Sequence, residues 1–127
     1  MLDNIEKDNF KKENLERLFY RWQSEGKDRD REFVKVARVV YYLTQGRSGK
    51  TENYDTALEE LILCRGIEEP ILRERLEKLA EELLLDEFKR IFIEDFRGRL
   101  KELKEEWELN GIKEDRKLIN NIINKIG

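Results

Sequence analysis

Apolar residues recur at spacings of three and four along most of this chain, and this periodicity is the feature that most restricts its fold. Such spacing places apolar side chains on one face of an α-helix. Only one proline interrupts the 127 residues, and the polar positions are rich in the helix-favouring residues Glu, Lys and Arg. The sequence therefore predicts an all-α fold, a compact bundle of about six helices in a single domain spanning residues 1–127.

Capping residues and glycines set the expected helix boundaries. The first helix is expected from about Asn4 to Gln23, and Asp28 or Asp30 is expected to cap the second. A loop with two glycines is expected over Gln45–Thr51. The remaining helices are expected over Asn53–Arg65, from Glu69-Pro70 to the region of Leu84, from an Asp86 cap to Asn110-Gly111, and from an Asp115 cap to Ile126.

The ionisable residues exclude several classes of protein. The chain has no histidine and one cysteine, so the usual zinc sites and histidine-based catalysis are excluded. Cys64 lies in an apolar stretch and is expected to be a small core residue. No apolar run approaches the ~18 residues of a membrane span, so a soluble, cytoplasmic protein is expected. We therefore expect no catalytic residues, no metal site and no tightly bound cofactor; the high content of Glu, Lys and Arg also suits a thermophile.

Charge is distributed unevenly along the chain, although the net charge is only −3. Residues 27–50 carry seven basic and three acidic side chains, and residues 89–104 carry six basic and three acidic ones. The segment between them, 51–88, carries twelve acids and four bases. If the two basic segments pack side by side, they form a positive face that can bind a polyanion. The alternative is that these charges pair with acids on a solvated surface.

The glycine-containing loop invites comparison with the phosphate-binding loop of nucleotide hydrolases. That loop has the pattern Gly-x-x-x-x-Gly-Lys-Ser/Thr between a strand and a helix. Here Thr44 stands where the first glycine belongs and no strand is expected, so a hydrolase loop is not expected. A glycine-rich backbone before a helix start, with Arg47 and Lys50, can still hold a phosphate. The alternative is a flexible surface loop.

Aromatic residues next to cations are a second candidate feature. Tyr41 and Tyr42 are adjacent on one expected helix and point in different directions, so we expect Tyr42 to be partly exposed. Exposed rings among Arg and Lys can stack on bases while the cations hold phosphates. The alternative for Trp22 and Trp107 is that both fill the core.

From about Asp30 to Ile123 the chain resembles the helix-bundle domain that follows the catalytic core in archaeal plasmid primase–polymerase and primase–helicase proteins. An aromatic pair before Gly46-Arg47 and an apolar helix closed by Arg65-Gly66-Ile67 carry the likeness. So do the acidic helix end at Asp86-Glu87, the segment 93–97 and the closing apolar helix after Gly111-Ile112.

This resemblance implies a module without catalysis of its own. It would bind single-stranded template DNA (or RNA) and nucleotides, such as ATP with Mg²⁺, and help a catalytic primase domain to begin a primer. The implied phosphate-binding residues are Arg47 and Lys50. The implied stacking surfaces are Tyr42, Tyr54 and Trp107, and the implied contacts to the strand's backbone are Lys35, Arg38, Arg90, Arg97 and Arg99.

Two other readings of the sequence remain open. The stretch from Val36 to Tyr42 leading to Gly46-Arg47 resembles the small helical subunit of type III CRISPR effector complexes, which implies binding along a crRNA–target duplex. A helical adaptor is the third possibility. It would bind another protein through an exposed apolar stripe, such as Ile119, Ile122, Ile123 and Ile126.

Overall fold

The computed structural model describes residues 12–26 and 28–126, and all regular structure within these ranges is α-helical. The predicted all-α fold is confirmed. The helices are α2 (Lys12–Glu25), α3 (Asp28–Arg47), α4 (Asn53–Leu63), α5 (Pro70–Arg90), α6 (Ile93–Asn110) and α7 (Lys113–Ile126). The predicted start of the first helix near Asn4 lies outside the described residues, and so does the side chain of Trp22.

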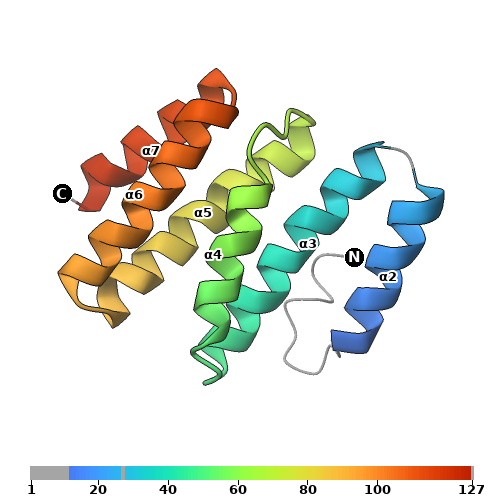
Figure 1. Cartoon of the computed structure of the whole chain (residues 1–127), viewed down its shortest axis with the longest axis horizontal. Coiled ribbons are helices and arrows are strands. Elements are labelled where there is room, and N and C mark those ends of the chain that lie inside the picture. Colours follow the sequence, from blue (N-terminus) through green and yellow to red (C-terminus); the bar gives the residue numbers. More distant parts are fainter. Residues whose placement is uncertain (1–11, 27, 127) are drawn as a thin grey trace.

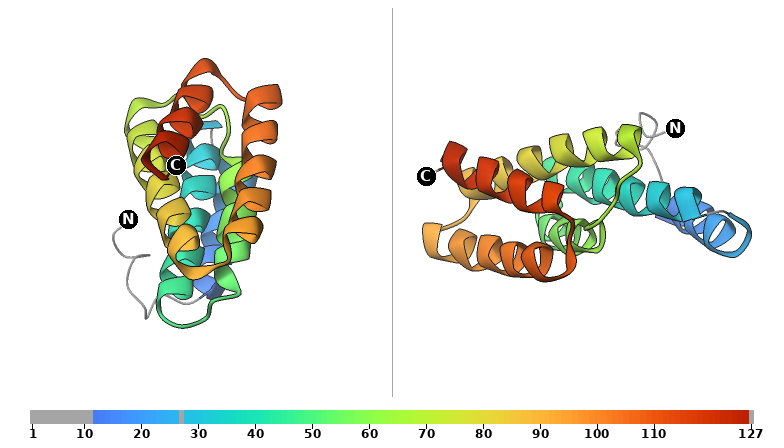
Figure 2. Two further views of the ribbon diagram at one scale, coloured as in Figure 1. Left: turned by 90° about the vertical axis from the view of Figure 1, so that its left-hand side faces the viewer. Right: turned by 90° about the horizontal axis from the view of Figure 1, so that it is seen from above.

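The helices follow one another along the long axis of the molecule, from α2 at one end to α7 at the other (Figure 1). Among the described helices, α2 packs against α3 alone, whereas α3 also packs against α4 and α5. In the C-terminal part, α5 and α7 lie on one side and α4 and α6 on the other (Figure 2). The ends of α5 and α7 and the start of α6 therefore meet at one end of the molecule.

Helix α3 is the buried centre of the structure, because it is covered from several directions. Its residues at positions 34, 36, 37 and 39–43 are all buried. A helix that is apolar around most of its circumference is one that has neighbours on most sides. Tyr41 and Tyr42 consequently both lie in the core, with their rings edge to face at 5.1 Å between centroids. The prediction that Tyr42 is partly exposed was wrong, since it assumed that α3 has a single buried face.

The glycine-containing loop is shorter than predicted, because α3 continues through Gly46 and Arg47. A Cβ atom on Gly46 would lie 2.9 Å from Cδ2 and Cε2 of Tyr54, so glycine is needed for the close approach of α4. The connection to α4 is closed by hydrogen bonds: the Ser48 N–H donates to Thr44 O, and the Asn53 N–H donates to Lys50 O. Gly46 is therefore a packing residue within a helix.

Helix α5 runs farther than predicted. Glu69 caps its start, accepting a hydrogen bond from the Leu72 N–H at 2.9 Å, with Pro70 in the first turn as expected. At the other end, Asp86 lies inside α5 and does not cap a new helix; the break comes at Ile91 and Phe92, before α6. The carboxylate of Asp86 instead accepts hydrogen bonds from Arg47 of α3 and Tyr54 of α4.

A buried carboxylate joins α7 to the preceding helices. Asp115 is fully buried and accepts hydrogen bonds from the N–H groups of Gly66 at 2.8 Å and Ile112 at 2.9 Å. It also forms an ion pair with the guanidinium of Arg73 from α5. Gly66, which follows α4, has φ +82°, a conformation that glycine adopts without strain. One carboxylate thus joins the end of α4, the body of α5 and the start of α7.

Candidate functional site

Several of the predicted site residues come together in a network of charges joining α3, α4, α5 and α6. The carboxylate of Asp86 is at its centre: Oδ2 accepts a hydrogen bond from Arg47 Nε at 2.7 Å and one from the Tyr54 hydroxyl at 3.3 Å. Burial, together with Asp86, raises the pKa of the Tyr54 hydroxyl, while the hydrogen bond to Asp86 raises the pKa of Arg47. Arg47 and Tyr54 thus lie close together, and both side chains are engaged with the same carboxylate.

The other half of this network surrounds Glu87, which is 1% exposed. Arg90 approaches its carboxylate at 3.3 Å and Arg99 at 3.2 Å, and Arg99 also pairs with Asp55 of α4. The guanidinium carbon of Arg90 lies 4.6 Å from the centroid of the Tyr54 ring. Because a buried carboxylate needs partners to compensate for lost hydration, these arginines neutralise Glu87.

These pairings bear directly on the predicted positive face. Arg47, Arg90 and Arg99 lie among four carboxylates, those of Asp55, Glu82, Asp86 and Glu87. The three cations are thus outnumbered by acids in their own network. A free phosphate would have to displace these carboxylates, so the pairing alternative describes this region better than a positive face does.

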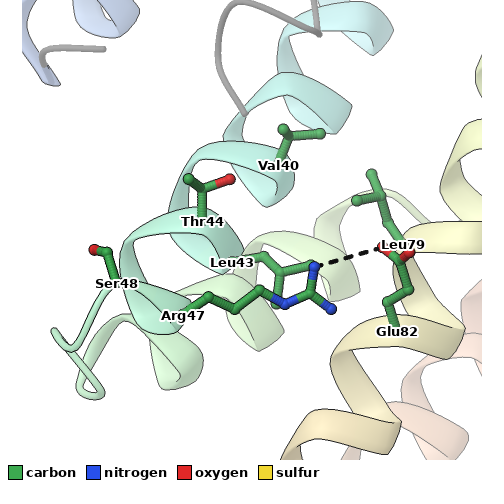
Figure 3. Close-up of a pocket in the computed structure, with 7 residues that line it drawn as sticks. All are labelled: Val40, Leu43, Thr44, Arg47, Ser48, Leu79 and Glu82. Atoms are coloured by element: carbon green, nitrogen blue, oxygen red, sulfur yellow. Dashed lines mark ion pairs between the residues drawn. The ribbon is translucent and has the colours of Figure 1, made fainter. Parts of the chain in front are cut away.

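A pocket of about 430 Å³ lies beside Arg47, between α3 and α5 (Figure 3). Its lining residues are Val40, Leu43, Thr44, Arg47, Ser48, Leu79 and Glu82. Arg47 points across the pocket toward Glu82, with 3.9 Å between Nη1 and Oε2 (Figure 3). The pocket lies at the C-terminal end of α3, where the helix dipole favours cations and disfavours anions. Charge and dipole both oppose the predicted phosphate site at Arg47, and Lys50 is exposed in the turn beyond it.

The remaining predicted cations do not extend this network. Arg38 pairs with Glu60 at 3.0 Å, and burial raises the pKa of Glu60 while Arg38 opposes that shift. Lys35 is exposed on the first half of α3, which lies on the α2 side of the molecule. Arg97 is exposed near the start of α6, at the opposite end (Figure 1). Among the described residues, the two basic segments therefore meet only in the paired network around Asp86 and Glu87, and they do not form one continuous positive face.

The rings predicted to stack on bases are all buried. Tyr42, Tyr54 and Trp107 are 7%, 6% and 0% exposed. The stacking prediction was wrong for these three, because α3, α4 and α6 turn their aromatic residues inward; the alternative that Trp107 fills the core is confirmed. The exposed rings in the described part are instead Tyr20, Phe88 and Phe92, the last being 82% exposed.

An apolar groove of about 510 Å³, which we call the C-terminal groove, lies where α5 ends, α6 begins and α7 ends. Its apolar residues are Phe88, Ile93, Phe96, Leu100, Ile123 and Ile126. Phe96 is buried and packs edge to face against the partly exposed Phe88, with centroids 5.2 Å apart. Three cations complete the lining, Arg97, Lys101 and Lys104.

Sequence reasoning found only part of this groove. Of the predicted apolar stripe, Ile123 and Ile126 line the groove, whereas Ile119 and Ile122 are buried in the core. The missed signal was on α6, where Arg97, Lys101 and Lys104 follow one another at helical spacings beside the apolar positions 93, 96 and 100.

No family model, curated protein or solved structure matches this chain. Within residues 12–26 and 28–126, no three His, Cys, Asp or Glu side chains gather in a group that could hold a metal ion. None of the described helices combines the length and hydropathy needed to cross a bilayer.

Proposed function

We propose that this chain is a protein-binding adaptor whose C-terminal groove receives the apolar face of a helix from a partner protein. The groove itself carries the proposal: six apolar side chains from three helices line one open cavity of about 510 Å³. An amphipathic helix that inserts residues at positions i, i+3 or i+4, and i+7 is a recurring ligand of such grooves.

Exposed apolar surface around the groove supports the same proposal. Ile93 is 52% exposed and Phe92, just before α6, is 82% exposed. Large apolar side chains scattered singly on a surface need no explanation, but gathered ones mark interaction sites. Covering them with a partner removes apolar area from water, and this burial is the main driving force for association.

A displayed library of 18-residue helical peptides, selected on the full chain, tests the proposal. The affinities of the selected peptides are then measured by fluorescence anisotropy for the wild type and for Ile126→Glu, which places a carboxylate in the groove. We expect binding to weaken about tenfold or more, because the apolar face of the peptide would have to desolvate a charge.

Leu109→Glu is the matched control, because Leu109 is 80% exposed and does not line the groove. Its affinity should stay within about twofold of the wild type. Circular dichroism checks that both variants remain folded. If the library yields no saturable binder, or if the binders tolerate Ile126→Glu, the adaptor proposal fails.

A second candidate is the nucleic-acid module that assists a primase, and one observation favours it. The exposed ring of Phe92 lies just before α6, and Arg97 and Lys101 are both exposed on that helix. Rings that stack on bases beside cations that hold phosphates are typical of single-strand binders. Of the residues first predicted to contact nucleic acid, this candidate retains Arg97 and adds Phe92 and Lys101.

A titration of labelled single-stranded DNA and RNA at low and moderate salt, with and without ATP and Mg²⁺, tests this second candidate. A primase module binds single-stranded DNA more tightly when ATP is present. A subunit that lines a crRNA duplex prefers RNA and is indifferent to ATP. Phosphate contacts weaken steeply with salt, so an absence of binding at low salt would remove both nucleic-acid readings.

A further inference from the structure

We propose that the partner helix is acidic, with Asp or Glu flanking its apolar face, and that Arg97, Lys101 and Lys104 select it. This inference rests on the proposed adaptor function and specifies the chemistry of its partner. It follows from the charges that border the C-terminal groove and from how little they are neutralised within the chain.

The three cations form one row along α6. They are four and then three residues apart, so they lie on neighbouring turns of the same helix face. All three line the groove. A helix lying in the groove would therefore have this row along one of its edges.

These charges are much less engaged than the arginines of the Asp86–Glu87 network. Lys101 pairs only with Glu105 among the described residues, at 3.9 Å, and both side chains are more than 60% exposed. Such an exposed pair contributes little. Arg97 and Lys104 form no ion pair within residues 12–26 and 28–126. The row therefore keeps its charge available to a ligand.

The sign of the charge distinguishes this groove from other hollows on the described surface. The nine residues that line it include three cations and no acid. The pocket beside Arg47 contains Glu82 as well as that arginine, and a third hollow, between α5 and α7, contains three acids (Glu74, Glu77 and Glu81) and two lysines (Lys78 and Lys125). In a chain with net charge −3, a groove whose charged lining residues are all cations favours a negatively charged ligand and disfavours a basic one.

The peptides selected from the helical library provide the first test. We expect them to carry an excess of Asp and Glu beside their apolar positions. The tightest binder is then labelled with a fluorophore and compared with a copy in which its acids are replaced by Lys. The acidic peptide should bind at least about tenfold more tightly than the Lys-substituted one. Raising the NaCl concentration from 50 to 500 mM should narrow this difference, because exposed charges are screened.

Charge reversal on the protein provides the second test. The triple variant Arg97→Glu, Lys101→Glu, Lys104→Glu should lose the preference and bind the Lys-substituted peptide more tightly than the acidic one. A control triple, Lys35→Glu, Lys113→Glu, Lys117→Glu, changes the net charge equally at exposed positions outside the groove. The control should keep the wild-type preference, which separates a local charge effect from that of net charge.

The outcomes distinguish this inference from the function on which it rests. The inference of an acidic partner would be wrong if the selected peptides show no excess of Asp and Glu, or if the triple charge-reversal variant still prefers the acidic peptide. Either result would leave the adaptor proposal standing. A library without any binder would overturn both. Dimerisation of the chain through the groove, seen by sedimentation velocity and abolished by Ile126→Glu, would replace the acidic partner with a second copy. A last outcome is that single-stranded DNA displaces the peptide from the wild type but not from the triple variant with reversed groove charges. That result would show that the three cations bind nucleic acid.

Discussion

Replacing Asp115 with alanine should be among the most damaging single changes in this chain. The substitution leaves the N–H groups of Gly66 and Ile112 without their acceptor, and it removes the buried partner of Arg73. Breaking a buried ion pair from one side costs about 3–5 kcal/mol, since the remaining charge is left uncompensated. Arg73 retains Glu77 at 3.1 Å, but that carboxylate is 46% exposed and compensates only in part. The loss is a large share of the ~5–15 kcal/mol that stabilises a typical domain.

Urea unfolding followed by far-ultraviolet circular dichroism measures this loss, with the slope of the transition checked for two-state behaviour. Asp115→Asn should cost less than Asp115→Ala, because an amide oxygen can still accept from both N–H groups, although Arg73 loses its charged partner in both variants. Glu102→Ala, at an exposed position of α6, is the control and should stay within about 0.5 kcal/mol of the wild type. A loss below about 1 kcal/mol for Asp115→Ala, with an unchanged slope, would refute the role given to this carboxylate.

Two glycines within helices should respond in opposite ways to the same change, since a Cβ on Gly46 would press on the ring of Tyr54 whereas one on Gly98 would meet nothing within 4 Å. Urea unfolding should show Gly46→Ala destabilised by about 1–3 kcal/mol and Gly98→Ala stabilised by about 0.5–1 kcal/mol; equal shifts would contradict the packing argument. Burial raises the pKa of the Cys64 thiol above its usual 9.0, so on raising the pH the thiol ionises first in the unfolded state. The free energy of unfolding of the wild type should therefore fall as the pH rises past about 9. The difference in unfolding free energy between wild type and Cys64→Ala should therefore shrink by up to about 1.4 kcal/mol per pH unit, and a difference that is constant between pH 8 and 10 would disprove it.

Much of the helical structure could be predicted because it depends on local signals. Pro70 at a helix start and Gly111 at a helix end mark boundaries that the chain contains in its own sequence. The extension of α5 through Asp86 escaped prediction for the opposite reason. Its aspartate resembles a cap locally, but its partners, Arg47 and Tyr54, are 39 and 32 residues away.

The candidate site was less predictable, because exposure depends on which helices become neighbours. Tyr42 is buried because α2, α4 and α5 all pack against α3, and the spacing of residues within α3 does not reveal this number. The same holds for the cations: Arg99 pairs with Asp55 and Glu87, whereas sequence reasoning recognises only partners three or four residues away. Arg97 and Lys101 remained available because no acid from another described helix reaches them.

Among the helices that the structure describes, α2 packs against α3 alone, which makes α2 a natural unit of partial unfolding. A helix supported by one neighbour opens at a lower free energy than the whole fold, so its amide hydrogens should exchange before those of α3. The pKa of Tyr41 is raised by burial, by Tyr42, and by Glu16 and Glu13 of α2. Release of α2 removes part of that burial and both of these carboxylates, and thereby lowers the pKa of the phenol. The pKa of Tyr41 thus depends on whether α2 is attached.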